Sequence, residues 1–241
     1  MKISIIVPAF NEEKLLPATL RSIQESSSSF KELRWENELI VCDNNSTDRT
    51  AELGRAAGAT VVFEPVNQIA RARNTGARTA SGDWLIFVDA DSQPTPALFA
   101  EVAEQIQSGP CVAGGVVLRF EGHYPIALRL AKGWNYLSRA LHYVAGSFIF
   151  CETRAFRELG GFDERLFASE EIEFSQRLKR FARARGRKIV ILHRHPLLTS
   201  ARKLHLYTPW EYFRFLVNTV LTGKRNLRRR DACGPWYDGR R

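Results

Sequence analysis

Two aspartates separated by one residue, Asp89 and Asp91, directly follow the apolar run Trp84–Val88. A wholly apolar run of this length is typical of a strand buried on both faces, so the two carboxylates are expected at its carboxyl end. Carboxylates this close repel each other unless a cation or polar ligand lies between them. Hard oxygen ligands with open positions suit Mg²⁺ or Mn²⁺ shared with a diphosphate. The alternative is an ordinary turn whose aspartates cap a helix.

Polar residues follow two more runs that are typical of strands. Pro8-Ala9-Phe10-Asn11-Glu12 comes after Ile3–Val7, and Asp43-Asn44-Asn45-Ser46-Thr47-Asp48 comes after Glu38–Cys42. Helical patterns separate the strands, which predicts a β-α-β-α-β-α-β order and an α/β fold. Ligands of such folds bind at the carboxyl ends of the strands. The three polar segments are therefore expected to meet at one edge of the sheet.

The remaining elements are predicted from periodicity and from turn residues. Thr95 is expected to cap a helix that has Pro96 at its first position, and Ser26–Ser29 is expected to be a loop. The other strands are predicted at Ala59–Phe63, Val112–Phe120, Tyr143–Cys151 and Lys188–His193. Helices are predicted at about Leu16–Ile23, Thr50–Ala57, Ile69–Ala80, Thr95–Gln107, Pro125–His142, Thr153–Leu159, Glu170–Arg185 and Thr208–Leu221.

Composition limits the class of protein. The 241 residues are 44% hydrophobic and 25% charged, as in ordinary globular domains, and no apolar run reaches the ~18 residues that span a bilayer. The four cysteines lie far apart in the sequence, which is typical of free thiols in a reducing cytoplasm. The net charge of +9 favours acidic partners. Part of it comes from the basic tail after Leu221.

Six segments in a fixed order resemble the motifs of family 2 glycosyltransferases. Besides the three polar segments, the resemblance rests on Ala72-Arg73-Asn74-Thr75-Gly76, Gly160-Gly161-Phe162-Asp163-Glu164 and Glu170–Arg177. It extends from about Ile3 to Arg202. It implies an inverting enzyme with a Rossmann-like nucleotide-diphospho-sugar transferase domain, a mostly parallel mixed sheet flanked by helices. Residues 1–203 would form this catalytic domain, with a nucleotide-binding half (1–110) and an acceptor half (111–203), and 204–241 a C-terminal helix and basic tail.

The resemblance also implies a nucleotide-sugar site. Asp43 would accept a hydrogen bond from the base or ribose, Arg71 or Arg73 would meet the base or a phosphate, and Arg202 would lie near the diphosphate. Gly146 would leave room in the wall of the donor-sugar and acceptor site. The same pocket would include Pro8, Ala9, Asn11, Glu12, Asn45, Asn74, Asp89 and Ala90. The alternative for Arg71 and Arg73 is a solvated helix face.

The resemblance also implies a bound metal ion and a catalytic base. Asp91 and Asp89, with His193 completing the shell, would bind Mn²⁺ or Mg²⁺, which stabilises the leaving diphosphate. The acceptor hydroxyl needs a base. The family usually carries Glu-Asp where this sequence has Glu170-Glu171, so Glu171 is expected to be the base, with Glu170 second. The alternative is an acidic first helical turn favoured by the helix dipole.

The expected enzyme is a hexosyltransferase-type glycosyltransferase that uses a UDP- or GDP-sugar. The aromatic last helix and the basic tail suit a lipid-linked acceptor and peripheral contact with the inner face of the membrane, and a homodimer also fits. Cytoplasmic location is expected, and nucleic acid is not an expected partner. Three alternatives remain. They are a nucleotidyltransferase, which normally has a Gly-rich loop after the first strand, a non-catalytic nucleic-acid- or membrane-binding protein, and an inactive relative that binds nucleotide.

Overall fold

The computed structural model describes residues 1–122, 125–202, 211 and 224–237. One eight-stranded sheet has the strand order β3-β2-β1-β4-β7-β6-β8-β5. Its strands are β1 (Lys2–Ala9), β2 (Glu36–Asp43), β3 (Thr60–Phe63), β4 (Trp84–Val88), β5 (Ser92–Gln93), β6 (Cys111–Phe120), β7 (Phe148–Glu152) and β8 (Lys188–Thr199).

Strands β1 to β4 pair in parallel, and β6 pairs in parallel with β8. Strand β7 is antiparallel to both β4 and β6, and β5 is antiparallel to β8. The predicted mostly parallel mixed sheet is therefore confirmed. The strand order reverses between β1 and β4, because the chain first adds β2 and β3 on one side of β1 and then β4 on the other. A reversal of this kind opens a crevice at the carboxyl ends of the strands, where α/β proteins bind ligands.

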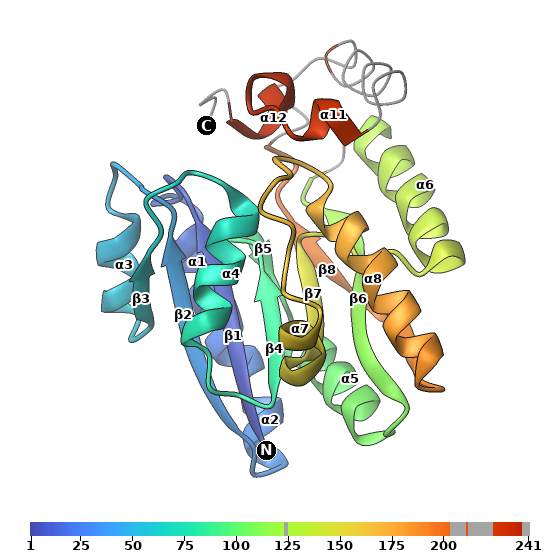
Figure 1. The fold of residues 1–241 in the computed structure, drawn as a ribbon. Helices are drawn as coiled ribbons and strands as arrows, with labels where there is room; N and C mark the ends of the chain where they lie inside the picture. Colours follow the sequence, from blue (N-terminus) through green and yellow to red (C-terminus); the bar gives the residue numbers. More distant parts are fainter. Residues whose placement is uncertain (123–124, 203–210, 212–223, 238–241) are drawn as a thin grey trace.

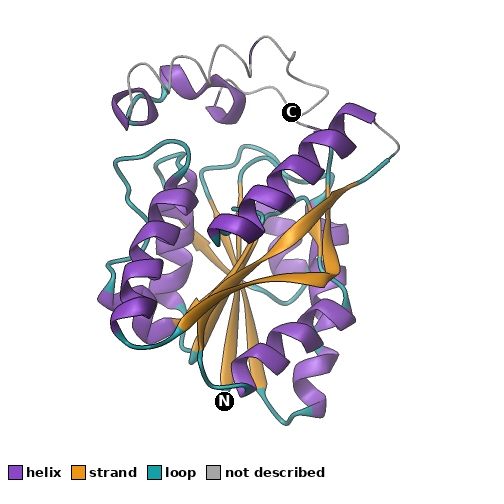
Figure 2. Ribbon diagram, turned by 90° about the vertical axis from the view of Figure 1, so that its right-hand side faces the viewer, coloured by secondary structure: helices purple, strands orange, loops and turns teal. Residues whose placement is uncertain are grey.

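Helices cover both faces of the sheet (Figures 1 and 2). Alternate residues of β1 point to opposite sides, so Ile5 packs with α1 and α5 while Ile6 packs with α4. Gly76 lets α4 approach β1 closely, since a Cβ there would lie 2.5 Å from Ile6 Cγ2. The helices are α1 (Leu16–Ser26), α2 (Ser28–Glu32), α3 (Thr50–Ala56), α4 (Ile69–Thr79), α5 (Pro96–Gln107), α6 (Pro125–Leu141), α7 (Thr153–Glu158) and α8 (Glu170–Ala184).

Most predicted elements are present within one or two residues of their expected ends. Trp84–Val88 is a fully buried strand, and the Thr95 side chain accepts a hydrogen bond from the Leu98 N–H, as expected of a helix cap. Three predictions were wrong in extent, and the third, strand β8, is described below. Most of the Ser26–Ser29 segment is helical, in the last residue of α1 and in α2, and the strand expected at Tyr143–Cys151 begins only at Phe148. The predicted helix Thr208–Leu221 lies almost wholly outside the described residues.

Strand β8 is longer than expected and contains a bulge. It continues past His193 to Thr199, but Leu192 pairs with Val116 and Leu197 with Leu118. Four residues of β8, 193–196, therefore stand opposite Val117 of β6. Pro196 lies in this bulge, where its missing N–H costs no ladder hydrogen bond.

The C-terminal segment contains α11 (Lys224–Leu227), a 3₁₀ turn at Asp231–Cys233 and α12 (Gly234–Tyr237). Figure 1 shows it above the carboxyl ends of the strands, at the opposite end of the molecule from the N-terminus. Leu227 and Cys233 are buried against Leu166 and Ala168, with Phe167 and Tyr237 packed beside them. The C-terminal segment therefore packs against the residues that lead into α8. No described helix is both long and apolar enough to traverse a bilayer.

Candidate active site

The turns that follow β1 and β2 are joined by hydrogen bonds. Asn11 N–H donates to Ser46 Oγ at 3.0 Å, and Asn11 Oδ1 accepts from Thr47 N–H at 2.8 Å. Asn11 and Asn45 both have positive φ, 52° and 67°, a conformation that asparagine tolerates better than most residues. Asp43 is buried at the end of β2 and accepts from Ser46 N–H. The polar turns therefore form one rigid rim, as the sequence indicated.

A buried arginine links three parts of the chain at this rim. Arg73 of α4 is only 1% exposed, and its Nη1 donates to Glu170 Oε1 at 2.5 Å. Its Nη2 donates to Asp89 Oδ1 at 3.0 Å and to the Gly146 carbonyl at 2.9 Å. Burial alone would lower the pKa of Arg73, but the charges of Asp89 and Glu170 outweigh it and raise that pKa. Arg73 is thus a cation held inside a carboxylate cluster.

A second arginine holds the other side of the rim. Arg202 Nη2 lies 2.6 Å from Glu12 Oε1 and 3.9 Å from Asp91 Oδ2. The pairing of β5 with β8 places it there, because Ser92 pairs with Thr199 and Ser200 N–H donates to the Asp91 carbonyl. Arg202, which the resemblance places near the diphosphate, therefore lies beside the Asp89–Asp91 turn, although more than a hundred residues separate the two in sequence.

Five carboxylates and two guanidinium groups make up this cluster. The carboxylates belong to Glu12, Asp89, Asp91, Glu170 and Glu171, and the cations to Arg73 and Arg202. With all of them ionised, the cluster has an excess of three negative charges. Asp89 and Asp91 keep 19% and 13% of their side chains exposed, so a solvent-borne ligand can reach them. Added positive charge would relieve their repulsion, which fits a divalent cation.

The described part of the chain does not by itself form a complete metal cage. It contains no group of three or more His, Cys, Asp or Glu side chains placed to hold one ion. Mg²⁺ and Mn²⁺ bound through one or two carboxylates normally take their other ligands from water and phosphate, so Asp89 and Asp91 still fit such an ion. This supports them as ligands and leaves open positions for a diphosphate.

His193 is not brought to these aspartates. It lies exposed at the start of the β8 bulge, and its neighbour Arg194 pairs with Glu101 and Glu104 of α5. The β6 partners of Leu192 and Thr199 are four positions apart, or about 13 Å at the usual rise of a strand. The predicted third ligand is therefore without geometric support.

Glu171 stands beside the Arg73 cluster at the start of α8. The residue is partly exposed, while its carboxyl is enclosed by protein. Burial raises the pKa of Glu171 to about 8, the charge of Glu170 adds to the rise, and Arg73 opposes it. A Cβ added to Gly146 would lie 3.1 Å from Arg73 Nη2 and 3.7 Å from the Glu171 carboxyl carbon. Glycine at this position therefore lets the backbone pass close to both Arg73 and the Glu171 carboxyl. A carboxylate with a raised pKa in such a place can serve as a base near neutral pH.

Two expected nucleotide contacts are occupied by protein. Asn74 Oδ1 accepts from Phe162 N–H, and its Nδ2 donates to the Phe162 carbonyl and to Glu164. Arg71 lies 3.4 Å from Glu164. These side chains hold the Gly160–Glu164 segment to α4, and their role in nucleotide binding stays a prediction.

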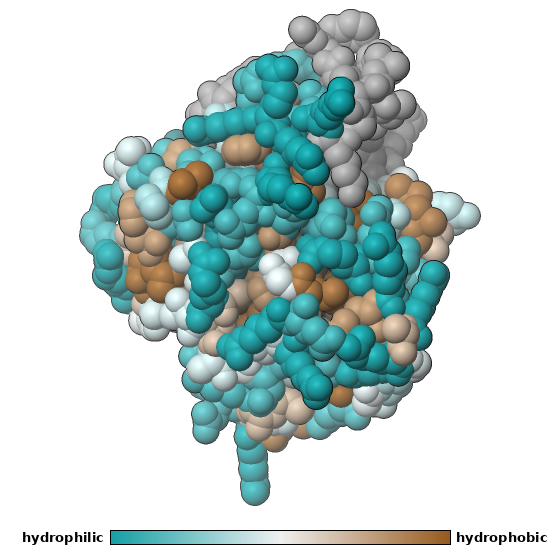
Figure 3. Space-filling model, in the orientation of Figure 1, coloured by the Kyte–Doolittle hydropathy of each residue, from teal (hydrophilic) through white to brown (hydrophobic). Residues whose placement is uncertain are grey.

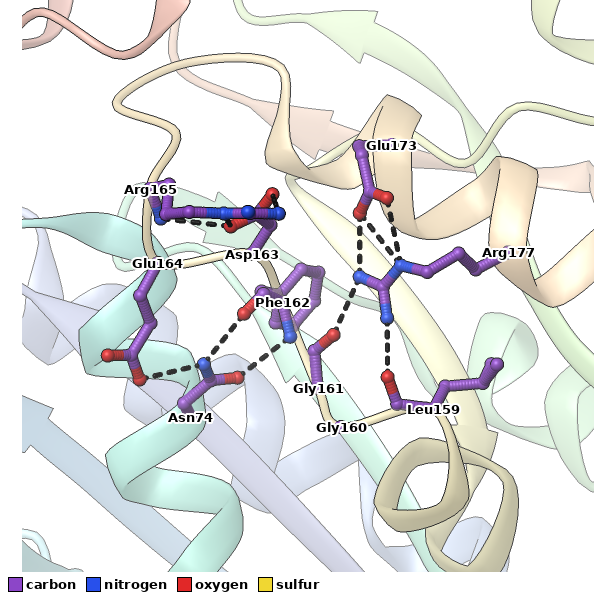
Figure 4. A pocket seen from close by; sticks show the side chains of 10 residues that line it. All are labelled: Asn74, Leu159, Gly160, Gly161, Phe162, Asp163, Glu164, Arg165, Glu173 and Arg177. Carbon is purple, nitrogen blue, oxygen red and sulfur yellow. Dashed lines mark hydrogen bonds and ion pairs between the residues drawn. The ribbon is translucent and has the colours of Figure 1, made fainter.

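Figure 4 shows this segment around an open polar pocket of about 450 Å³. The Arg177 guanidinium, paired with Glu173, donates to the carbonyls of Leu159 and Gly161, and Arg165 pairs with Asp163. The charged side chains that line the pocket are thus held in ion pairs. None of the five carboxylates of the Arg73 and Arg202 cluster lines it, so the pocket is separate from that cluster.

The other predicted residues are at or next to the rim. Pro8 and Ala9 end β1, where the Ala9 carbonyl accepts from Asn44 N–H, and the Ala90 carbonyl accepts from Thr19 Oγ1. Asn45 is exposed. Sequence reasoning missed Asn44, whose amide donates to the carbonyls of Glu64 and Val66, and Gln68, whose amide donates to those of Glu164 and Leu166. A polar residue directly after a buried strand was the available signal for Asn44.

The comparisons with known proteins agree with this geometry. A mannosyltransferase from Pyrobaculum calidifontis, solved with GDP-mannose and Mn²⁺, superposes with a TM-score of 0.70 at 22% identity, over 92% of this chain and 64% of that one. Glucosyl-3-phosphoglycerate synthase from Mycobacterium tuberculosis, solved with Mg²⁺ and UDP, superposes with a TM-score of 0.60 at 21% identity, over 92% and 78%. The fold is therefore that of nucleotide-sugar transferases.

The sequence assigns the family. The profile described as glycosyl transferase family 2 matches residues 4–160, so the chain belongs to glycosyl transferase family 2 and is a glycosyltransferase. It is 38% identical over 111 residues to an uncharacterized glycosyltransferase of Haemophilus influenzae, which is 45% of this chain and 35% of that protein. It is 33% identical over 122 residues to undecaprenyl-phosphate 4-deoxy-4-formamido-L-arabinose transferase of Pseudomonas fluorescens, which is 47% and 35%. The matched stretch thus spans about a third of these relatives.

Proposed function

We propose that the protein transfers a sugar from a UDP- or GDP-sugar to an acceptor hydroxyl, with inversion at the sugar carbon and with Mn²⁺ or Mg²⁺ as cofactor. The observation that carries this proposal is the carboxylate cluster at the strand-order reversal, with its excess of negative charge and its accessible Asp89 and Asp91. The structural neighbours solved with GDP-mannose and Mn²⁺ or with UDP and Mg²⁺ support it by analogy.

Residues of the cluster and of the rim beside it would act together in this reaction. Asp43 would bind the base or ribose, Asp89 and Asp91 would hold the cation, and Arg202 lies where the diphosphate would arrive. The bound cation supplies Lewis-acid stabilisation of the leaving diphosphate. Glu171 takes the proton of the acceptor hydroxyl, and the acceptor oxygen forms a bond to the anomeric carbon. The bond from that carbon to the diphosphate breaks, and its electron pair leaves with the nucleoside diphosphate.

Thermal unfolding with a panel of nucleoside diphosphates tests the donor site. A ligand that binds the folded protein raises the melting temperature. We expect one diphosphate to do so, with a larger effect when Mn²⁺ is present, and we expect Asp91→Asn to remove the part that depends on metal. Asp163→Asn is the control, because Asp163 lies in the separate pocket of Figure 4. Equal responses of both variants would contradict the assignment.

A lipid-linked acceptor is the favoured acceptor class. The relative from Pseudomonas fluorescens is named for undecaprenyl phosphate, a lipid. Helix α6 offers a matching surface, with Tyr136, Leu137 and Leu141 exposed by 78%, 44% and 41%. The sequence from Gly122 to Cys151 contains no acidic residue. Figure 3 shows hydrophobic atoms at the surface where α6 lies in Figure 1. Exposed apolar side chains on a basic helix suit the surface of an anionic bilayer.

A further inference from the structure

The C-terminal segment contacts both elements that carry the Arg73–Glu170 pair. Tyr237 of α12 lies at the start of α4, where its hydroxyl oxygen accepts from the Ile69 N–H at 3.3 Å. Its ring packs edge-on against Phe167, with centroids 5.5 Å apart. Arg73 is one turn further along α4, and Glu170 is three residues after Phe167. The Tyr237 side chain therefore contacts the chain close to both partners of the ion pair, at Ile69 before Arg73 and at Phe167 before Glu170.

The C-terminal segment also contacts the turn before α8, which Gln68 holds from the other side of the chain through the Leu166 carbonyl. Phe167 N–H donates to the Leu227 carbonyl at 2.7 Å, and Leu166 and Ala168 are buried against Leu227 and Cys233. The next residue, Ser169, has a φ of 61°, which serine rarely adopts. Its side chain makes no capping hydrogen bond to α8. A strained conformation of this kind persists only where the surroundings hold it, and much of what surrounds this turn is the C-terminal segment.

The electrostatics agree with this proximity. Burial raises the pKa of Cys233 to about 11, and the charge of Glu170 adds to the rise. Burial also raises the pKa of Tyr237, and the charge of Glu170 again contributes. Both groups are therefore neutral near pH 7 and lie within reach of the field of Glu170. Cys233 and Tyr237 therefore lie near the Glu170 carboxylate and add no charge of their own.

We propose that Tyr237 is a positioning residue, which fixes the turn before α8 against the start of α4 and so sets the place and the enclosure of Glu170 and Glu171. The proposal rests on the proposed function for its catalytic consequence, although the coupling itself can be measured without any reaction. Tyr237 touches no reacting atom. It acts through the backbone of the Leu166–Ser169 turn and through Ile69.

Two substitutions of Tyr237 separate its two contacts. Tyr237→Phe removes the hydroxyl that accepts from Ile69 N–H and keeps the ring, while Tyr237→Ala removes both contacts. Tyr136→Ala is the matched control, because Tyr136 is exposed on α6. Cys233 reports the state of the segment, since the other cysteines, Cys42, Cys111 and Cys151, are also buried but lie in the sheet. We expect its reaction with a thiol reagent to accelerate in Tyr237→Ala and to stay unchanged in the control.

Amide hydrogen exchange tests the coupling directly. In Tyr237→Ala, exchange should rise in residues 166–171 and at the start of α4, and in Tyr237→Phe chiefly at Ile69. Unchanged exchange in these segments, together with a more reactive Cys233, would overturn the proposal. This result does not depend on whether the donor has been identified.

Kinetics test the consequence for catalysis, with release of nucleoside diphosphate from UDP-glucose and GDP-mannose as the assay and water as acceptor. A displacement of about 1 Å can cost roughly a hundredfold in rate, so we expect kcat of Tyr237→Ala to fall by at least about tenfold. The affinity for nucleoside diphosphate and Mn²⁺ should stay within about twofold, and Tyr237→Phe should recover most of the rate. A wild-type kcat and pH profile in Tyr237→Ala would overturn the positioning role. If the wild-type protein hydrolyses neither donor, the proposed function is at fault and the exchange result decides the coupling.

Discussion

Arg73 and Glu170 form a buried ion pair, with 2.5 Å between Nη1 and Oε1 and with 1% and 4% of the two side chains exposed. The same guanidinium also binds Asp89. One side chain therefore connects the proposed metal ligand Asp89 to Glu170, which directly precedes the proposed base Glu171. A change at either end reaches the other through Arg73, so the two sites form a single electrostatic unit.

Removing Arg73 should be strongly destabilising. Arg73→Ala leaves Asp89, Glu170 and Glu171 close together without their shared cation, and breaking a buried ion pair in this way typically costs about 3–5 kcal/mol. Urea unfolding at pH 7 measures the loss. The loss should shrink at lower pH, where the carboxylates are protonated. Arg78→Ala, at an exposed position on the same helix, serves as the control. A loss equal to that of the control would show that the cluster does not depend on Arg73.

Glu171 should make activity depend on pH. Because its pKa is raised to about 8, the base form increases as pH rises towards that value, and so should kcat/KM of the free enzyme. Glu171→Gln should lower the rate by about 10²–10⁴-fold and remove this limb of the profile. Glu173→Gln, two residues further along α8, is the control. If Glu171→Gln kept the wild-type profile, Glu171 would not be the base.

The same pKa shift has a consequence for stability. The folded protein keeps a proton on Glu171 between the ordinary pKa of 4.5 and about 8, whereas the unfolded chain has lost it. The unfolded state then binds fewer protons, so the free energy of unfolding falls as pH rises through this window. Glu171→Gln should flatten this slope and be more stable than the wild type at pH 8. Chemical unfolding at several pH values measures both. If Glu171→Gln left the dependence of the unfolding free energy on pH unaltered, the group with the raised pKa would not be Glu171.

Gly146→Ala should reduce transfer and spare donor binding. The new methyl group would lie 3.1 Å from Arg73 Nη2 and 3.7 Å from the Glu171 carboxyl carbon, so Arg73 would have to shift beside the proposed base. We expect kcat to fall by about tenfold or more, with diphosphate affinity nearly unchanged. Gly133→Ala on α6 is the matched control, because nothing lies within 4 Å of a Cβ there. A parallel loss of diphosphate affinity would place Gly146 in the donor site.

Helix α6 should bind anionic membranes. Exchanging Tyr136 and Leu137 for serine removes exposed apolar area, and sedimentation with vesicles of phosphatidylcholine and phosphatidylglycerol should weaken by about tenfold. Phe63→Ser changes an exposed aromatic side chain on β3, at one edge of the sheet, and should have no effect. If the wild type, the double variant and Phe63→Ser all bound the vesicles equally, α6 would not be the surface that contacts the membrane.

Much of the fold follows from local signals. The run Trp84–Val88 is apolar at every position, and Thr95-Pro96 has the chemistry of a helix start, so both were predictable from a few residues. The bulge of β8 was not, because His193–Pro196 breaks the apolar pattern and imitates the end of a strand. Helix α2 was missed because serine-rich segments usually form loops.

The residues of the candidate site also divide into those that local sequence predicts and those that it does not. Residues placed directly after a strand, such as Asp43 and Asp91, were predictable, since the end of the strand fixes where they lie. Arg73 was assigned to the base or a phosphate because of the family resemblance. No local pattern shows that three carbonyl and carboxyl partners from distant segments enclose it. Tyr237 depends on packing across 168 residues of chain, which a sequence motif does not encode.

Because of the bulge, the number of residues in β8 does not fix which residues of β8 and β6 pair with each other. Residues 193–196 leave the ladder and return to it, yet Thr199 still reaches Ser92 and Arg202 still reaches Asp91. A change in the number of residues in the bulge would therefore leave the pairing of Thr199 with Ser92 in place. For the same reason, a fluorescent label or a short peptide tag placed at His195 would report on the enzyme while leaving its active site intact.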